Sequence, residues 1–422
     1  MKKMTLFSLV LLVSLFSLFF MSTGALAEEV VIGFTGPLSG PAAQYGRDNV
    51  AGLEMAVADL NKAGGIKVAG KKYSFKLVTY DDHVDPTAAV NNARRLVSRD
   101  KAKVIFNPVF STLAPLTAIN EQRGSEFLLM AYTSTPALDQ IKNKLTIAIP
   151  PPFVAYLEAY MEYAWEKGWR KGAMVVTLGA YGDEWRQAFK KSWIEKGGEI
   201  LADQPANYYT ETDFSSHLAA ALATKPDFLL IGGPSDPTAL VIEQARNLGF
   251  QGGFILVDQA KMNYIADVAF KGDLSKMNNL VGVARTLDIG PKHIMQPFIE
   301  RYSKEYSGRV ATSENVLNYS AMRMLAAAME KAGTVSDLPS IKAALPTILP
   351  MDPKVNLVAY MGMLETRFLV PGTVQSIEND QYQTSIQNVW WPKNKEEFEE
   401  VVKQIPEREV ISKYLPLEGY SK

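Results

Sequence analysis

Two hydroxyl-rich loops stand where predicted β-strands end. Ser111 and Thr112 open a predicted helix after one strand, and residues 132–135, Tyr-Thr-Ser-Thr, follow the next strand. Hydroxyls and the free N–H groups of a helix N-terminus can hold a carboxylate without a full counter-charge. Helix capping explains either loop equally simply. Because the loops follow consecutive strands, a carboxylate site stays open beside the capping interpretation.

Three further side chains could meet such a ligand. Asp258 follows the apolar run 254–257, so we expect it at the mouth of a cleft, where its carboxylate could pair with an ammonium group. A helix-capping aspartate is the alternative. Tyr45 and Tyr181 offer flat, amphipathic rings from the two halves of the chain, although packing alone would account for either ring.

The sequence lacks the residue patterns of catalysis, metal binding and nucleotide binding. Its three histidines, His83, His217 and His293, are far apart, and it has no cysteine, so no zinc site is expected. Neither a P-loop, nor a dinucleotide-binding glycine pattern, nor a G-x-S-x-G nucleophile motif occurs. We therefore predict no catalytic residues, no metal and no cofactor, and we do not expect an enzyme.

The elements that must position these loops alternate between strand and helix. In the first part of the chain the hydrophobic patterns predict strands at 30–34, 73–80, 104–107, 127–131 and 147–149, and helices at 49–62, 87–100 and 113–122. Asp85 is a good N-cap and Pro86 suits the first helical position, which supports the second of these helices. The alternation implies a parallel, doubly wound sheet, and small molecules bind outside the carboxyl ends of such strands.

The same rhythm restarts after Pro150-Pro151-Pro152. The patterns there predict helices at 156–167, 183–196 and 238–248, and strands at 172–177, 228–231 and 254–257. A strand at 281–286 is expected to leave this second lobe. A long helix at 313–331 has no partner strand nearby in sequence, so we expect the chain to return to the first lobe.

A predicted hairpin at 374–377 and 386–390 brings the chain back to the second lobe. Several crossings between two lobes make a hinge. The predicted fold class is α/β, with two doubly wound parallel-sheet lobes joined by a multi-strand hinge. The lobes are assigned to residues 28–149 with 284–372, and 150–283 with 373–422.

The N-terminus has the pattern of a secretory signal. Lys2 and Lys3 precede an apolar run at 6–21, and Ala25-Leu26-Ala27 supplies the small residues of a cleavage site. We expect cleavage near Ala27, which makes residues 1–27 a signal peptide; an uncleaved membrane anchor is the alternative. Without cysteine the exported chain has neither disulfides nor a lipid-modified cysteine, so a free periplasmic protein fits best.

Charge and composition restrict the partners. The 44 basic residues include the two lysines of the signal, so the remaining chain carries 42 basic against 45 acidic residues, a formal charge of −3. Its basic residues are scattered among acids, whereas a nucleic-acid binder would show a basic face, so no nucleic-acid partner is expected. A hydrophobic content of 47% suits a soluble globular core, and no second apolar stretch is long enough to span a bilayer.

With these motifs the chain resembles the branched-chain amino-acid type of periplasmic solute-binding protein, the type I ligand-binding family of ABC transporters. The motifs that carry the resemblance, in order, are Ile32-Gly33-Phe34-Thr35-Gly36-Pro37-Leu38-Ser39-Gly40, Ala43-Gln44-Tyr45-Gly46, Asn61-Lys62-Ala63-Gly64-Gly65-Ile66, Tyr80-Asp81-Asp82-His83-Val84-Asp85-Pro86, Tyr181-Gly182, Gly232-Gly233 and Gln244-Ala245-Arg246-Asn247-Leu248-Gly249. The resemblance covers nearly the whole chain after the signal.

The resemblance implies a function and a site. It implies an extracytoplasmic binding component of an ABC transporter that closes its lobes on an amino acid or related small carboxylate, docks on an inner-membrane permease, and acts as a monomer. Ser111, Thr133 and Thr135 would hold the ligand α-carboxylate, Asp258 its α-ammonium, and the two tyrosines would cover it. The candidate ligand-binding residues are Tyr45, Phe110, Ser111, Thr112, Thr133, Ser134, Thr135, Tyr181, Ser235 and Asp258.

Departures from the family pattern leave other ligands and roles open. The first loop reads Phe110-Ser111-Thr112 instead of a serine-rich run, Pro234-Ser235 stands where an aromatic is common, the family's cysteine pair is absent, and the stretch 349–370 is unfamiliar. Aromatic acids or amides are therefore alternatives to aliphatic amino acids. A sensor or regulator that reports the ligand to a signalling partner is the alternative to transport.

Overall fold

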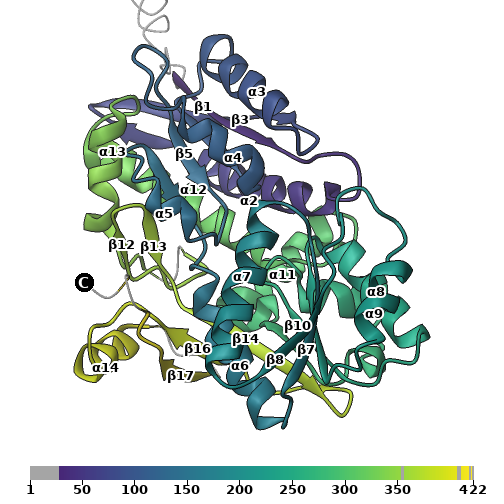
Figure 1. Cartoon of the computed structure of the whole chain (residues 1–422). Helices are drawn as coiled ribbons and strands as arrows, with labels where there is room; N and C mark the ends of the chain where they lie inside the picture. Colours follow the sequence, from purple (N-terminus) through teal and green to yellow (C-terminus); the bar gives the residue numbers. More distant parts are fainter. Residues whose placement is uncertain (1–27, 353–355, 406–409, 418–419, 421–422) are drawn as a thin grey trace, which may run out of the picture.

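The computed structural model of the chain describes residues 28–352, 356–405, 410–417 and 420. The predicted signal and its cleavage site lie outside these residues. Two sheets, each flanked by helices, form an upper and a lower lobe in Figure 1. We call the lobe built on the eight-stranded sheet the first lobe and that built on the nine-stranded sheet the second lobe. The predicted α/β class with two parallel-dominated sheets is confirmed.

The first sheet has the strand order β12-β13-β6-β5-β4-β1-β3-β2. Its strands are β1 (Glu28–Gly36), β2 (Ile66–Val68), β3 (Lys71–Asp81), β4 (Val104–Asn107), β5 (Leu128–Ala131), β6 (Thr146–Ala148), β12 (Gly362–Leu364) and β13 (Arg367–Leu369). Strands β3, β1, β4, β5 and β6 are parallel, as the sequence predicts. The unfamiliar stretch ends in β12 and β13, which extend this sheet beyond β6.

The second sheet has the order β17-β16-β14-β11-β10-β9-β7-β8, with β15 paired to β14. Its strands are β7 (Lys171–Val176), β8 (Glu199–Asp203), β9 (Phe228–Gly232), β10 (Gly253–Leu256), β11 (Leu280–Val283), β14 (Gly372–Glu378), β15 (Gln381–Tyr382), β16 (Ile386–Val389) and β17 (Ile411–Tyr414). Strand β14 is antiparallel to β11 and β16, so this sheet is mixed.

Helices cover both sheets. Those of the first lobe are α2 (Ala43–Lys62), α3 (Pro86–Ser98), α4 (Phe110–Thr117), α5 (Ala137–Gln140), α11 (Lys292–Glu305), α12 (Ser313–Ala332) and α13 (Leu338–Ala344). Those of the second are α6 (Val154–Glu166), α7 (Ala180–Glu195), α8 (Ser215–Leu222), α9 (Ser235–Asn247), α10 (Met262–Tyr264) and α14 (Lys395–Gln404). Among the residues the structure describes, no helix is both long and apolar enough to cross a membrane.

Local sequence explains several helix boundaries. Asp85 caps α3 by accepting a hydrogen bond from the Ala88 N–H, with Pro86 at the first helical position, as predicted. Thr312 and Asn315 form a capping box that starts the long helix α12. Helix α12 packs against α2 so closely that a Cβ on Gly52 would lie 2.3 Å from the Asn315 carbonyl oxygen. Glycine is therefore required at that contact.

Several elements differ from the predicted ones. Helix α2 begins at Ala43 instead of 49, and α4 spans Phe110–Thr117 instead of 113–122, so both helices start directly after the strand-end loops. Strand β11 ends at Val283 and is paired with β14 along its length and with β10 at Leu280 and Val281, so the chain leaves the second lobe only afterwards. Strand β8 and helix α8 were not predicted.

Candidate ligand cleft

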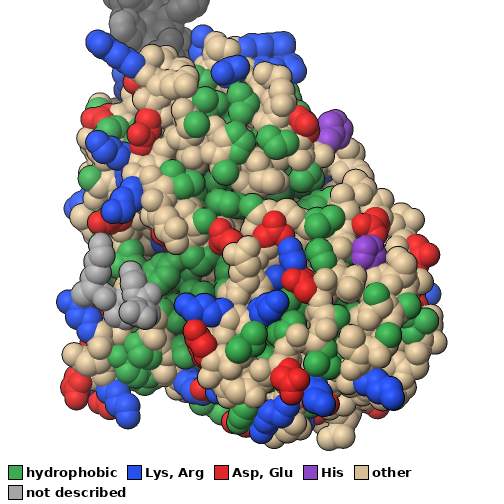
Figure 2. All heavy atoms as spheres, in the orientation of Figure 1, with side chains coloured by type: hydrophobic (Ala, Val, Ile, Leu, Met, Phe, Trp, Pro, Cys, Tyr) green, Lys and Arg blue, Asp and Glu red, His purple; other side chains and the backbone are tan. Residues whose placement is uncertain are grey.

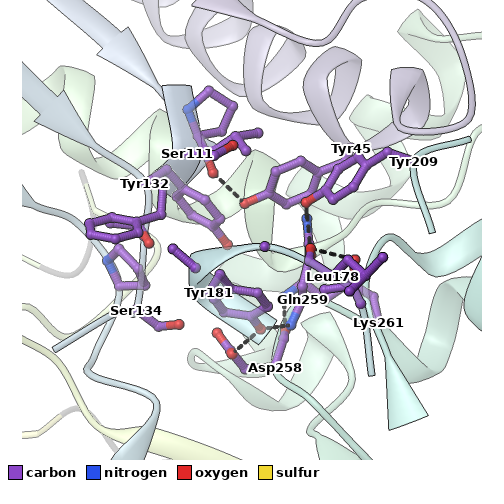
Figure 3. A pocket seen from close by; sticks show the side chains of 18 residues that line it. Tyr45, Ser111, Tyr132, Ser134, Leu178, Tyr181, Tyr209, Asp258, Gln259 and Lys261 are labelled. Carbon is purple, nitrogen blue, oxygen red and sulfur yellow. Dashed lines mark hydrogen bonds between the residues drawn. The ribbon is translucent and has the colours of Figure 1, made fainter. Parts of the chain in front are cut away.

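A cleft lies between the two lobes, at the carboxyl ends of β4, β5, β7 and β10, and holds about 520 Å³ of space between atoms, its open mouth included (Figure 3). Its lining consists of Tyr45, Pro108, Val109, Phe110, Ser111, Tyr132, Thr133, Ser134, Pro150, Thr177, Leu178, Gly179, Ala180, Tyr181, Tyr209, Asp258, Gln259 and Lys261. Seven of the predicted ligand-binding residues line it: Tyr45, Phe110, Ser111, Thr133, Ser134, Tyr181 and Asp258. Thr112, Thr135 and Ser235 lie behind this surface.

The loop after β4 forms one part of the first-lobe wall. The Tyr45 hydroxyl donates to the Pro108 carbonyl at 2.9 Å and so fixes the start of the loop. Ser111 lies on the cleft surface. The Thr112 hydroxyl is fully buried and bonded to Asn107 Oδ1 at 3.2 Å and to the Val109 carbonyl at 3.0 Å. Thr112 thus bonds back to the start of its own helix, but it is not the capping residue of the alternative interpretation, because no side chain caps the N-terminus of α4.

The loop after β5 forms the other part of that wall. Thr133 and Ser134 line the cleft, and Thr135 lies directly behind them. The hydroxyl oxygens of Ser134 and Thr135 are buried and have no hydrogen-bond partner among the described residues. Buried hydroxyls normally have hydrogen-bond partners, so these two hydroxyls are still able to form a hydrogen bond with a ligand.

The second-lobe wall carries Asp258 at the end of β10. Asp258 is 8% exposed, and its Oδ1 accepts hydrogen bonds from the Tyr181 hydroxyl at 2.6 Å and from Trp185 Nε1 at 2.9 Å. The Tyr181 oxygen in turn accepts the Gln259 N–H at 3.2 Å. Burial, and secondly the charge of Asp258, raises the pKa of Tyr181 well above its ordinary value, so the phenol stays a donor to the carboxylate.

Four tyrosines surround the space between the walls (Figure 3). The rings of Tyr45 and Tyr132 lie 6.2 Å apart on the first lobe, and Tyr181 and Tyr209 face them from the second lobe. Gln259 Nε2 donates to the Tyr209 hydroxyl at 3.3 Å. Burial raises the pKa of Tyr209 to about 12, so its hydroxyl is protonated at neutral pH. The cleft therefore combines apolar rings with protonated phenols.

A buried ion pair crosses between the lobes beside the cleft. Lys261, after β10, lies 3.2 Å from a carboxylate oxygen of Glu314 on α12, and their side chains are 7% and 1% exposed. The Lys261 ammonium also donates to the Asp258 carbonyl, and its backbone N–H donates to Ser235 Oγ at 3.0 Å. Ser235 thus holds the segment that carries Lys261.

Sequence reasoning missed several residues of the site. Lys261 lies on a strand-end loop three residues after Asp258, so the order of strand and loop could have predicted its place at the cleft. No sequence pattern could have found Tyr209 or Glu314. Tyr209 follows the unpredicted strand β8, and Glu314 approaches the cleft from helix α12 of the first lobe. In the described part of the chain no cluster of three or more potential metal ligands occurs, and His83 lies exposed beside Asp81.

Comparison with known proteins identifies the family to which this two-lobed α/β chain belongs. The sequence pattern of the periplasmic binding protein family matches residues 29–359, and the chain belongs to that family. The Leu/Ile/Val-binding protein of Escherichia coli K12 is 30% identical over 241 residues, which cover 56% of this chain and 62% of that protein. The leucine-, isoleucine-, valine-, threonine- and alanine-binding protein of Pseudomonas aeruginosa is 26% identical over 329 residues, 74% of this chain and 81% of that protein.

Solved structures share the fold. The leucine-binding protein of Thermotoga maritima superposes with a TM-score of 0.70 at 20% identity and covers 84% of this chain and 97% of its own. The resemblance to branched-chain amino-acid binding proteins inferred from the motifs is thus confirmed, whereas the ligand-binding residues stay a prediction.

Proposed function

We propose that this protein is the extracytoplasmic solute-binding component of an ABC transporter and captures an amino acid or related small carboxylate between its lobes. The observation that carries the proposal is the pairing of two unlike walls: unpartnered hydroxyls from the first lobe and the Asp258 carboxylate from the second. The relatives named as Leu/Ile/Val-binding proteins support the ligand class. After signal cleavage near Ala27 the protein works in the periplasm as a monomer and delivers its ligand to an inner-membrane permease.

Capture is reversible and non-covalent. The ligand docks its carboxylate on the first lobe, and the second lobe closes over it so that Asp258 meets the ammonium group. Only a ligand that touches both walls favours the closed state, because a ligand shifts a conformational equilibrium by its differential affinity for the two states. Each hydrogen bond to a charged group contributes about 1.5–3 kcal/mol in such a site.

A thermal-shift screen of residues 28–422 tests the proposal. The compounds are the twenty amino acids, aromatic acids such as benzoate, and short amides. A ligand at 100 times its Kd adds about 2.7 kcal/mol to stability, so we expect at least one carboxylate-bearing compound to raise Tm by about 2 °C or more. Stabilisation by neutral amides alone, with no effect of any acid, would contradict the proposed ligand class.

A further inference from the structure

A buried arginine lies behind the hydroxyl loop of the first lobe. Arg367, the first residue of β13, is 1% exposed. Its Nη1 donates to the carbonyls of Thr133 at 3.2 Å and Pro150 at 2.8 Å, and its Nη2 donates to the carbonyl of Thr135 at 3.1 Å. Its Nε donates to Asp139 Oδ2 at 2.8 Å, and this carboxylate balances the charge of the guanidinium.

Asp139 is fixed in turn. Its Oδ1 accepts the Thr366 hydroxyl at 2.9 Å, and its Oδ2 accepts the Tyr420 hydroxyl at 2.9 Å as well. Arg367 is therefore held on one side by a carboxylate with three donors and on the other by the backbone of the ligand loop. Its rigid planar fork suits several acceptors at once, which a lysine ammonium on a flexible stem cannot match.

These contacts decide which groups the loop can offer to a ligand. The carbonyls of Thr133 and Thr135 are taken by Arg367, and the carbonyl of Ser134 accepts the Phe153 N–H at 2.9 Å. All three carbonyls are thus turned to the protein. The Ser134 hydroxyl is left on the cleft side of the loop, and the Thr135 hydroxyl lies directly behind it. The two residues are 3% and 0% exposed, and neither hydroxyl has a partner among the described residues. In Figure 3 Ser134 faces the same space as Asp258.

We infer that Arg367 is a positioning residue that makes the Thr133–Thr135 loop selective for the anionic end of the ligand. With its carbonyls bonded to Arg367 and to the Phe153 N–H, the loop turns hydroxyls instead of carbonyls toward the cleft. These hydroxyls can donate to a carboxylate, whereas the carbonyls that would best accept an ammonium group face away, so the cationic end is left to Asp258. This inference rests on the proposed function and assigns a role to the unfamiliar stretch that contains β13. Because the same guanidinium binds Pro150, at the first crossing between the lobes, it also ties the ligand loop to the hinge.

Matched acid and amide pairs test the inference. Calorimetry would give the Kd of L-leucine and L-leucinamide, and of benzoate and benzamide, for the wild type, R367M, R367K and the control R301M. Arg301 lies on α11 of the same lobe and pairs with Asp59 and Glu305 instead. A hydrogen bond to a charged group is lost with the amide, so we expect the wild type to prefer the acid by about tenfold or more.

In R367M and R367K the freed carbonyls can turn toward the cleft, so the acid preference should fall by about fivefold or more, roughly one hydrogen bond. In R301M it should stay as in the wild type. A folded R367M that keeps the wild-type acid preference would overturn the inference. A loss of stability with an unchanged preference would make Arg367 purely structural and would overturn it as well.

A second pair of variants covers the case in which R367M does not fold. S134A and T135V remove the two unpartnered hydroxyls without burying a new polar group, and each should weaken binding of the acid more than binding of the amide and so lower the acid preference. Unchanged preference in both variants would overturn the inference. Failure of the proposed function is distinguishable, because then the wild type itself would bind neither leucine nor benzoate.

Discussion

The two walls of the cleft satisfy their polar groups in opposite ways. The first-lobe wall has no charged side chain on its surface and keeps the hydroxyls of Ser134 and Thr135 unpartnered among the described residues. The second-lobe wall carries Asp258 and Lys261, whose charges already have protein partners. This difference is the basis of the proposal that the first-lobe wall takes the anionic end of a ligand through its hydroxyls and the second-lobe wall takes a cationic end through the carboxylate of Asp258.

Space-filling Figure 2 shows no such contrast between the lobes on the face that it presents. Basic and acidic side chains occur on both lobes of the face shown, so neither lobe presents a surface of one sign there. The distinction described above concerns the buried cleft, where a low dielectric strengthens each charge interaction. Variants of single buried groups can therefore test it.

The largest effect is expected where the lobes share a buried charge pair. Lys261→Met leaves the Glu314 carboxylate, 1% exposed, without its cation. Breaking a buried pair in this way costs about 3–5 kcal/mol, so urea unfolding at pH 7 should show a fall of that size in the free energy of unfolding. The double variant Lys261→Met/Glu314→Gln is the control and should recover a large part of the loss. A single variant as stable as the wild type would show that the pair contributes nothing.

A smaller effect is expected from Asp82, a buried carboxyl in the loop after β3 whose hydrogen-bond donors among the described residues are all neutral. Asp82 accepts hydrogen bonds from Val84 N–H at 3.0 Å and from the Thr35 hydroxyl at 3.3 Å, and burial raises its pKa to about 6. An unfolded aspartate has a pKa near 3.9, so between about pH 4 and pH 6 the folded state binds the extra proton, and stability falls as the pH rises through this window.

Asp82→Asn should remove this contribution, which is about 3 kcal/mol at most by the size of the shift. The difference in unfolding free energy between variant and wild type, measured in urea at pH 4, 5, 6 and 7, should move in favour of the variant as the pH rises. A difference independent of pH would contradict the raised pKa.

The smallest effect is expected at the phenol that orients Asp258. Tyr181→Phe keeps the ring and removes the 2.6 Å hydrogen bond to the carboxylate. One hydrogen bond contributes about 1 kcal/mol, so affinity for an amino-acid ligand should fall about fivefold in calorimetry. Tyr209→Phe is the matched control, because its hydroxyl bonds Gln259 at 3.3 Å and does not reach Asp258 by any hydrogen bond found in the described residues. Equal effects of the two variants would argue against a special role for Tyr181.

The sequence predicts those parts of the molecule that depend on local pattern. The strand at Val104–Asn107 and the cap at Asp85 follow from periodicity and side-chain chemistry, and strand ends locate the loops that line the cleft. Strand–loop order places Asp258 correctly at the cleft, since an apolar run followed by a carboxylate marks the carboxyl end of a buried strand.

Contacts between distant segments could not be predicted in this way. Arg367 reaches a loop more than 230 residues earlier in the chain, and Glu314 meets Lys261 only because α12 returns to the first lobe. The sequence also cannot tell a hydroxyl that bonds within the protein from one that lines the cleft: Thr112 and Ser134 look alike in the chain, yet Thr112 bonds to the Val109 carbonyl and Ser134 lines the cleft. Such assignments depend on which partners the tertiary fold supplies.

The most direct test of the two-wall account compares three ligands on wild type and Asp258→Asn by calorimetry: L-leucine, L-leucinamide and 4-methylpentanoate, which lacks the amine. The account predicts that the variant loses about tenfold or more of its affinity for leucine, the loss of a charged hydrogen bond, while 4-methylpentanoate binds as before and the preference for leucine over leucinamide persists. Equal losses for leucine and 4-methylpentanoate, or no loss for either, would contradict the assignment of opposite ligand ends to opposite walls.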